Sequence, residues 1–150
     1  MDLKDIYTEL ILEESRNPRN RRHLEDPSMV ELGHNPSCGD EITLEIKLEG
    51  DTLTDISYNG HGCAISQAST SIMCDLTRKK TKEETLYLCH LFLGMVKGEI
   101  ETEEELEVLE DGMVFQNMKN LPARIKCAVL PWYTLKNMLE SGNTSESFRQ

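Results

Sequence analysis

The chain has 150 residues, and 27 acidic against 16 basic side chains give it a formal charge of −11 at pH 7. That charge repels phosphate backbones and argues against nucleic acid as a partner. No stretch approaches the roughly 18 apolar residues of a membrane span, and the N-terminal segment lacks the apolar core of a signal peptide. We therefore expect a cytoplasmic protein with no membrane partner, folded as a single domain over 1–150 because no Pro/Gly/Ser-rich break divides it.

A helix is the first predicted element. Asp2 can cap it and Asn17-Pro18 ends it. Its apolar residues recur at helical spacing: Leu3, Ile6, Tyr7, Leu10 and Ile11. The segment "SRNPRNRRHLEDP" then gathers Arg16, Arg19, Arg21 and Arg22. We interpret these arginines either as solvated surface or as a docking patch for an acidic partner protein.

Strands are predicted next. A short strand is expected over 29–32. Between Ile42 and Leu48 apolar and polar residues alternate, which is the period of a half-buried antiparallel strand. Gly50-Asp51 predicts a hairpin turn into a return strand over 53–58. The sheet should therefore have about three antiparallel strands.

The rest of the chain is predicted to be helical. The sequence "NGHGC" allows a tight corner before a helix over 64–79, and Thr81 with Glu84 forms a capping box for the next helix. Pro122 suits the first turn of a last helix that ends near 139. The pattern predicts an α+β fold, a small antiparallel sheet with helices packed mainly on one face. Residues 142–150 are expected to form a flexible tail.

Two of the five cysteines should meet at one end of the sheet, and a third could join them. Cys38 lies in the loop before the main strand and Cys63 at the junction of the last strand with its helix, and the hairpin brings these two positions together. Asp40, two residues from Cys38 in extended chain, projects to the same side. Cys127 in the last helix could supply a fourth group, giving three thiolates and a carboxylate that suit tetrahedral zinc. Buried apolar filling is the alternative for scattered cysteines.

Other candidates lie close to these ligands. His34 and His61 could serve as alternative ligands or as hydrogen-bond donors to the ligands. Cys74 and Cys89 lie mid-helix among apolar neighbours and are interpreted as buried fillers. An odd number of cysteines in a reducing compartment argues against a disulfide framework.

Three blocks, "NPSCGDEI", "GHGCAISQASTSIM" and "LPARIKCAVLPW", resemble the signature blocks of the U-type iron–sulfur cluster assembly family, and more closely its SufU branch. The resemblance spans nearly the whole chain and keeps the blocks in order. Carried over residue by residue, it implies a metal site on Cys38, Asp40, Cys63 and Cys127. These are the four groups that the predicted topology brings together.

Two departures favour the SufU branch over the scaffold members of the family. Scaffold members have a histidine immediately before the last cysteine, where this chain has Lys126, and a chaperone-binding "LPPVK" motif, where this chain reads "LPARIK". We expect residues 81–111 to supply the insertion of the SufU-like members. The resemblance implies zinc binding and the acceptance of persulfide sulfur from a cysteine desulfurase of the SufS type, upstream of other iron–sulfur assembly proteins.

Within that resemblance, Cys38 is the expected sulfur acceptor because it lies on a loop that Gly39 allows to move. Three thiolates and a carboxylate around a divalent cation leave a net negative charge. Arg124, three residues before Cys127 on the same helical face, could support that charge or form a surface salt bridge. Two alternatives stay open: a scaffold that holds a labile iron–sulfur cluster, and an interaction module with a structural zinc.

Overall fold

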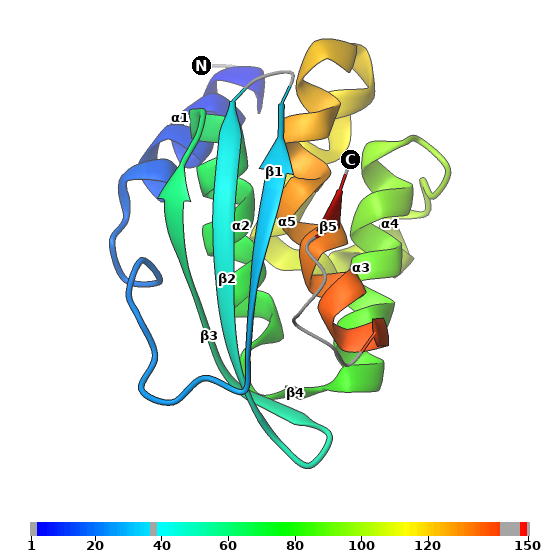
Figure 1. The fold of residues 1–150 in the computed structure, drawn as a ribbon. Helices are drawn as coiled ribbons and strands as arrows, with labels where there is room; N and C mark the ends of the chain where they lie inside the picture. Colours follow the sequence, from blue (N-terminus) through cyan, green and yellow to red (C-terminus); the bar gives the residue numbers. More distant parts are fainter. Residues whose placement is uncertain (1–2, 37–38, 142–147, 150) are drawn as a thin grey trace.

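A five-stranded sheet with the order β4-β3-β2-β1-β5 forms one layer of the structure (Figure 1). The structure is a computed structural model that describes residues 3–36, 39–141 and 148–149. The strands are β1 (Met29–Asn35), β2 (Asp40–Glu49), β3 (Thr52–His61), β4 (Lys80–Thr81) and β5 (Phe148–Arg149). β2 pairs antiparallel with β1 and β3, and β3 pairs antiparallel with β4. The predicted antiparallel meander is confirmed, with two short strands added at its edges.

The β2–β3 hairpin follows from the alternation in the sequence. Ile42, Leu44 and Ile46 are fully buried against the helices, so the intervening residues of β2 project to the other face. Gly50 in the turn has a φ of +62°, in the left-handed region that favours glycine. The hairpin register places Glu41 opposite His61 and thereby brings the start of β2 next to the end of β3.

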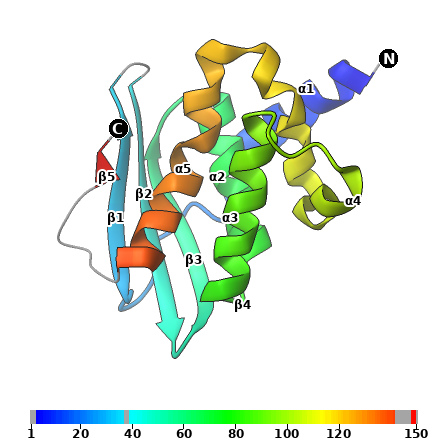
Figure 2. The ribbon, with the colours of Figure 1, turned by 90° about the vertical axis from the view of Figure 1, so that its right-hand side faces the viewer.

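The helices lie on one face of this sheet, as predicted. They are α1 (Leu3–Arg16), α2 (Ala64–Thr77), α3 (Lys82–Val96), α4 (Glu103–Leu106), the 3-10 segment η1 (Glu107–Asn120) and α5 (Pro122–Ser141). Figure 2 shows α2 and α5 between the sheet and α3. Residues 81–111, expected as a branch-specific insertion, contribute α3, α4 and the start of η1, and that assignment stays a prediction. None of the helices in the described ranges is long and apolar enough to cross a membrane.

Local signals set most helix boundaries. The Thr81 hydroxyl accepts a hydrogen bond from the Glu84 N–H at 3.1 Å, and the Glu84 carboxylate accepts one from the Thr81 N–H at 2.9 Å. The predicted capping box is therefore confirmed. α2 ends two residues earlier than expected, because Lys79 has a φ of +72° and donates its N–H to Leu53 O at 2.7 Å, which turns the chain into β4.

Aromatic packing fixes α5 against its neighbours. Trp132 stacks on Phe92 of α3, with ring centroids 4.3 Å apart and planes inclined by 11°. The Trp132 Nε1–H also donates to Ser69 Oγ of α2 at 3.1 Å, and the Ser69 hydroxyl donates to Ala128 O at 2.6 Å. Because buried aromatic pairs and satisfied polar groups hold one geometry, these contacts fix the start of α5, including Cys127, relative to α2.

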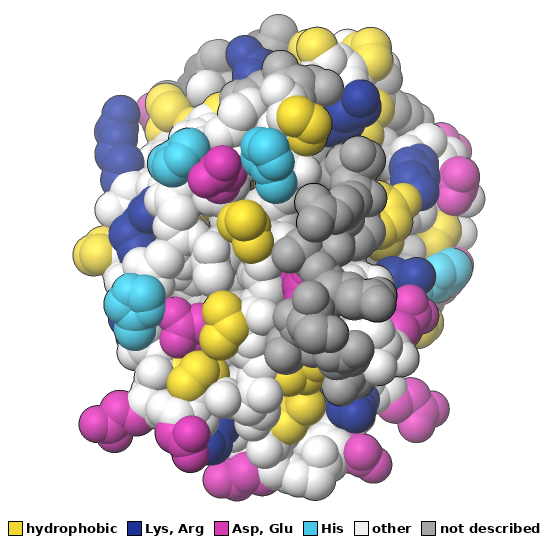
Figure 3. All heavy atoms as spheres, viewed as in Figure 1, with side chains coloured by type: hydrophobic (Ala, Val, Ile, Leu, Met, Phe, Trp, Pro, Cys, Tyr) yellow, Lys and Arg dark blue, Asp and Glu magenta, His cyan; other side chains and the backbone are white. Residues whose placement is uncertain are grey.

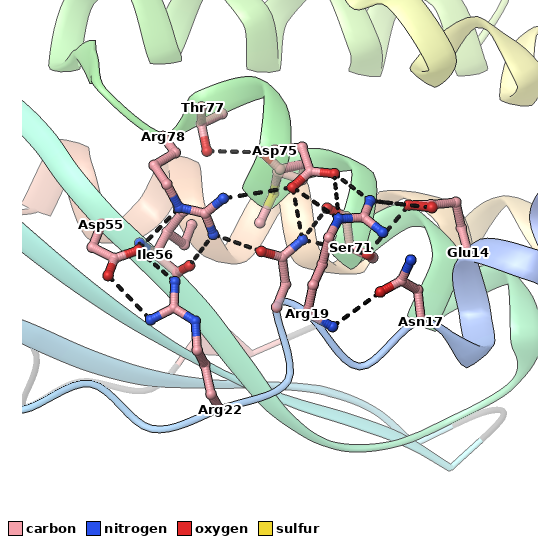
Figure 4. Close-up of polar contacts among 12 residues, drawn as sticks. Glu14, Asn17, Arg19, Arg22, Asp55, Ile56, Ser71, Asp75, Thr77 and Arg78 are labelled. Atoms are coloured by element: carbon pink, nitrogen blue, oxygen red, sulfur yellow. Dashed lines mark hydrogen bonds and ion pairs between the residues drawn. The ribbon is translucent and has the colours of Figure 1, made fainter.

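Most of the clustered arginines have partners within the chain (Figure 4). Arg19 forms ion pairs with Glu14 and Asp75, and Arg22 donates to Asp55 at 2.7 Å. Arg21 donates to a backbone carbonyl, that of Gly60, at 2.9 Å. These bonds tie the segment after α1 to α2 and β3. They count against the hypothesis of an arginine docking patch.

The flexible tail expected over 142–150 stays a prediction, although Phe148 and Arg149 within it are paired. These two residues form β5, which pairs in parallel with Gly33 and His34 of β1. An edge strand has unpaired N–H and C=O groups, and another segment of the same chain can satisfy them. Residues 142–147 and 150 lie outside the described part of the chain.

Candidate metal centre

Asp40, Cys63 and Cys127 converge at one end of the sheet, at the top of Figure 1. Asp40 is the first residue of β2, Cys63 lies two residues after the end of β3, and Cys127 lies in the second turn of α5. One carboxylate oxygen and the two sulfur atoms all lie within 4.8 Å of one another. The predicted meeting of these three residues is thus present in the structure.

The hairpin register and the pleat of β2 orient the Asp40 carboxylate. Asp40 shares its face of the strand with Ile42 and is fully buried on the helix side. Its Oδ1 accepts a hydrogen bond from the backbone N–H of Cys63 at 2.9 Å. A buried carboxylate needs such bonds or a cation to offset its lost hydration.

Gly62 makes room for that carboxylate. A Cβ at residue 62 would lie 2.5 Å from Asp40 Oδ1 and 2.5 Å from Ser66 Oγ, closer than side chains can pack. The sequence predicted a glycine corner here but gave no sign that the glycine faces a site. Ser66 was missed as well: its hydroxyl donates to Cys63 O at 3.1 Å. The signal that could have revealed Ser66 is its place three residues into α2, after Cys63 at the N-cap.

Cys63 is half-buried, and its thiol is more acidic than those of the buried Cys74 and Cys89. The pKa of Cys63 is lowered to about 6, first by a hydrogen bond from the Cys127 thiol and then by the backbone N–H of Ser66. Burial and the charge of Asp40 oppose this shift. The thiolate is the form that binds metals and acts as a nucleophile. The lowered pKa favours the thiolate form of Cys63.

The described groups fit a zinc ion. Two thiols and a carboxylate close enough to contact one ion form three corners of a tetrahedral site, and sulfur ligands favour zinc over calcium or magnesium. Cys38, the fourth predicted ligand and the predicted sulfur acceptor, lies outside the described residues. Gly39, which follows it, has a φ of +75° and donates its N–H to Asn35 O at 2.9 Å.

The remaining candidates are two exposed histidines and two buried cysteines. His34 and His61 are exposed and contact Glu41 on the face of the sheet opposite to the Asp40 carboxylate, and their role as alternative ligands or as donors to the ligands stays a prediction. Burial raises the pKa of Cys74 and of Cys89 to about 12, as expected of inert fillers. The cysteines within the described ranges form no disulfide.

Arg124 lies in the first turn of α5 with its side chain exposed. Residues three apart on a helix share a face, so Arg124 and Cys127 are neighbours along α5. Its predicted support of the site's charge stays a prediction. The alternative, a surface salt bridge, is not formed with another described residue.

The sequence matches the model of the NifU-like N-terminal domain family over residues 6–141. It is 37% identical over 145 residues to the zinc-dependent sulfurtransferase SufU of Bacillus subtilis, covering 95% of this chain and 97% of the relative. It is 39% identical over 140 residues to the iron-sulfur cluster assembly scaffold protein IscU of Thermotoga maritima, with coverages of 93% and 96%.

Solved structures agree with this match. The putative iron-sulfur cluster assembly scaffold protein for the SUF system from Fervidobacterium islandicum superposes with a TM-score of 0.83 and 40% identity, over 92% of this chain and 99% of the other. A NifU-like N-terminal protein from Brucella abortus has a TM-score of 0.80 at 24% identity, over 94% and 99%, and shares the fold.

Proposed function

This chain belongs to the NifU-like N-terminal domain family, and on that premise we propose that it serves iron–sulfur cluster assembly as a zinc-dependent sulfur acceptor. The relatives that cover it almost completely are named for sulfur transfer or for cluster assembly. The partner would be a cysteine desulfurase of the SufS type, which supplies sulfur as a persulfide. Later assembly proteins would receive it.

The observation that carries the proposal is the convergence of Asp40, Cys63 and Cys127 within 4.8 Å. Together with Cys38 they would hold the ion. Zinc, when bound, would keep its thiol ligands deprotonated near neutral pH. Asp40 would be the ligand that exchanges most readily, because a carboxylate binds zinc less strongly than a thiolate does. Its hydrogen bond from the Cys63 N–H would keep it aimed at the site.

The transfer step needs a thiolate that can move. The Cys38 thiolate would attack the outer sulfur of the donor's cysteine persulfide, a new S–S bond would form as the donor's S–S bond breaks, and the donor cysteine would leave as a thiolate. Cys63 occupies the N-cap position of α2 and Cys127 is buried within α5, so a large movement of either would disturb a helix. We assign the acceptor role to Cys38 because it precedes Gly39, a residue whose φ of +75° lies in the region that glycine adopts readily.

The proposal predicts that zinc binding and sulfur transfer separate in variants. Cys38→Ser should abolish stimulation of the desulfurase and the persulfide on this chain, even where zinc is partly retained. Asp40→Ala should lower activity through weakened zinc retention, with Cys38 still present. Zinc content and persulfide mapping by mass spectrometry measure both effects. Cys89→Ala, a change at a buried filler, is the matched control that should keep zinc and transfer.

Two results would contradict this assignment. A Cys38→Ser protein that stimulates the desulfurase fully, with persulfide on Cys63 or Cys127, would move the acceptor role to another cysteine. A preparation with a stoichiometric iron–sulfur chromophore and no zinc would favour the scaffold function. The scaffold name of the Thermotoga relative favours that second candidate, whereas Lys126 in the place of the scaffold histidine opposes it. Zinc without any persulfide would indicate a structural metal only.

A further inference from the structure

A row of three ionisable side chains crosses the open face of the sheet. The register pairs His34 of β1 with Glu41 of β2, and Glu41 with His61 of β3. Figure 3 views this face, on which histidine and acidic side chains gather near one end. The three residues lie at the same end of the sheet as the Asp40–Cys63–Cys127 centre but on the opposite side, because successive residues of a strand alternate between faces.

The ring nitrogens of both histidines already face one carboxylate. His34 Nε2 lies 3.8 Å from Glu41 Oε1, and His61 Nε2 lies 3.5 Å from Glu41 Oε2. Two ligand atoms bound to the same tetrahedral zinc lie about 3.4 Å apart, given bonds of about 2.1 Å. The three residues do not offer one ligand atom each within 4.8 Å of one another, as the inner centre does, so their side chains must rotate to bind one ion. Their exposure, 45% for His34 and Glu41 and 73% for His61, permits such rotations.

The chemistry of the set is that of a transition-metal site. Two neutral imidazoles and one carboxylate suit zinc, nickel or copper, with the remaining positions open to water. The set carries a net negative charge when the histidines are neutral, which favours a divalent cation. In contrast, the inner centre offers thiolates. The outer site would bind an ion less tightly than the inner centre does, because its ligands are solvated and must be ordered on binding.

We propose that His34, Glu41 and His61 form a second site for a divalent transition cation, distinct from the Asp40–Cys63–Cys127 centre. The proposal is independent of the sulfur-acceptor function. The three ligands come from three adjacent strands, and β2 links the two sites directly, since Asp40 and Glu41 are consecutive. The chain would then present a thiolate-rich site and an imidazole site on the two faces of one sheet end.

The test uses the full chain loaded with one equivalent of zinc and then titrated with nickel by calorimetry. The parent should bind one further ion. His34→Ala and His61→Ala should each weaken that binding at least tenfold, and Glu41→Gln should act similarly while keeping the side-chain shape. His23→Ala is the matched control. His23 is exposed on the same face, and its Nδ1 lies 2.6 Å from Glu45 Oε2, but no second histidine pairs with Glu45. It should bind nickel like the parent.

Spectroscopy separates the two sites. Bound nickel should broaden the imidazole NMR signals of His34 and His61 without producing the charge-transfer absorption of nickel thiolates. Melting curves confirm that each variant is folded. Nickel binding that is unchanged in the His34→Ala/His61→Ala double variant would overturn the proposal. Binding that appears only with thiolate absorption, or no binding beyond the zinc, would also overturn it and leave the three residues as an ion-pair row.

Discussion

Gly62→Ala tests whether the geometry around the Asp40 carboxylate controls metal binding. The added Cβ would lie 2.5 Å from Asp40 Oδ1 and 2.5 Å from Ser66 Oγ, about 0.9 Å inside the ordinary contact of 3.4 Å. The Ser66 hydroxyl can rotate away. The carboxylate is fully buried and bonded to the Cys63 N–H, so it can move only by giving up that bond.

The cost of such overpacking is about 1–3 kcal/mol. Without metal the Asp40 carboxylate can swing aside and relieve part of the strain, whereas the metal-bound form needs it in place. We therefore expect most of the cost to appear in binding, as a loss of about 5- to 150-fold in zinc affinity. Competition with a chromophoric chelator measures the affinity, and thermal unfolding of the metal-free protein measures the strain that remains.

Gly112→Ala is the matched control for this change. A Cβ there would make only ordinary contacts, at 3.5 Å to Leu109 and Leu76. The Gly112→Ala protein should therefore hold zinc like the parent. If Gly62→Ala also held zinc like the parent, the carboxylate would not be a ligand in the position that the structure gives it, and the reasoning about this site would fail.

Two further predictions concern stability. Asp55→Asn should lower the free energy of unfolding by about 1 kcal/mol, a value discounted because the side chain is 35% exposed. The hydrogen bonds from Arg22, and then from Arg78, lower the pKa of Asp55 from 3.8 to about 2. The stabilisation is therefore present above pH 3.8 and is lost as the pH falls toward 2. Urea unfolding curves of parent and variant should converge at that low pH. Cys63→Ser, like a chelator, should lower the melting temperature of the zinc-loaded protein. Cys74→Ala should leave zinc content unchanged and cost about 1 kcal/mol, and a melting curve insensitive to metal loss would show that the site does not join its three elements.

The main elements of the fold could be predicted from the sequence because each is long enough to show a side-chain periodicity. Strand β2 shows several alternations, and the capping box at Thr81 is a local chemical signal that the structure reproduces. The strands β4 and β5 have two residues each, too few for any period. They form because the sheet edges leave backbone groups to be paired, which depends on tertiary structure and not on local sequence.

The part of the candidate site that depends on strand topology could be predicted from the sequence. A hairpin must bring the start of β2 next to the end of β3, so the meeting of Asp40 and Cys63 followed from the strands alone. The position of Cys127 depends on how α5 packs, through contacts such as the one from Trp132 to Ser69, which no sequence period encodes. The side of the sheet on which the histidines project could have been inferred. His34 pairs with Glu41, whose parity in β2 is opposite to that of the buried apolar residues.

The acidity of Cys63 connects these packing contacts to the chemistry of the site. The hydrogen bond that lowers the pKa of Cys63 comes from the thiol proton of Cys127. A metal that binds both sulfurs must displace this proton, because ligands bind as thiolates. The buried charge of Asp40, which raises the pKa of Cys63, becomes favourable once a cation lies between them. The contacts that hold α5 against α2 therefore prepare the two thiols for an ion, and metal binding should release a proton and strengthen as the pH rises.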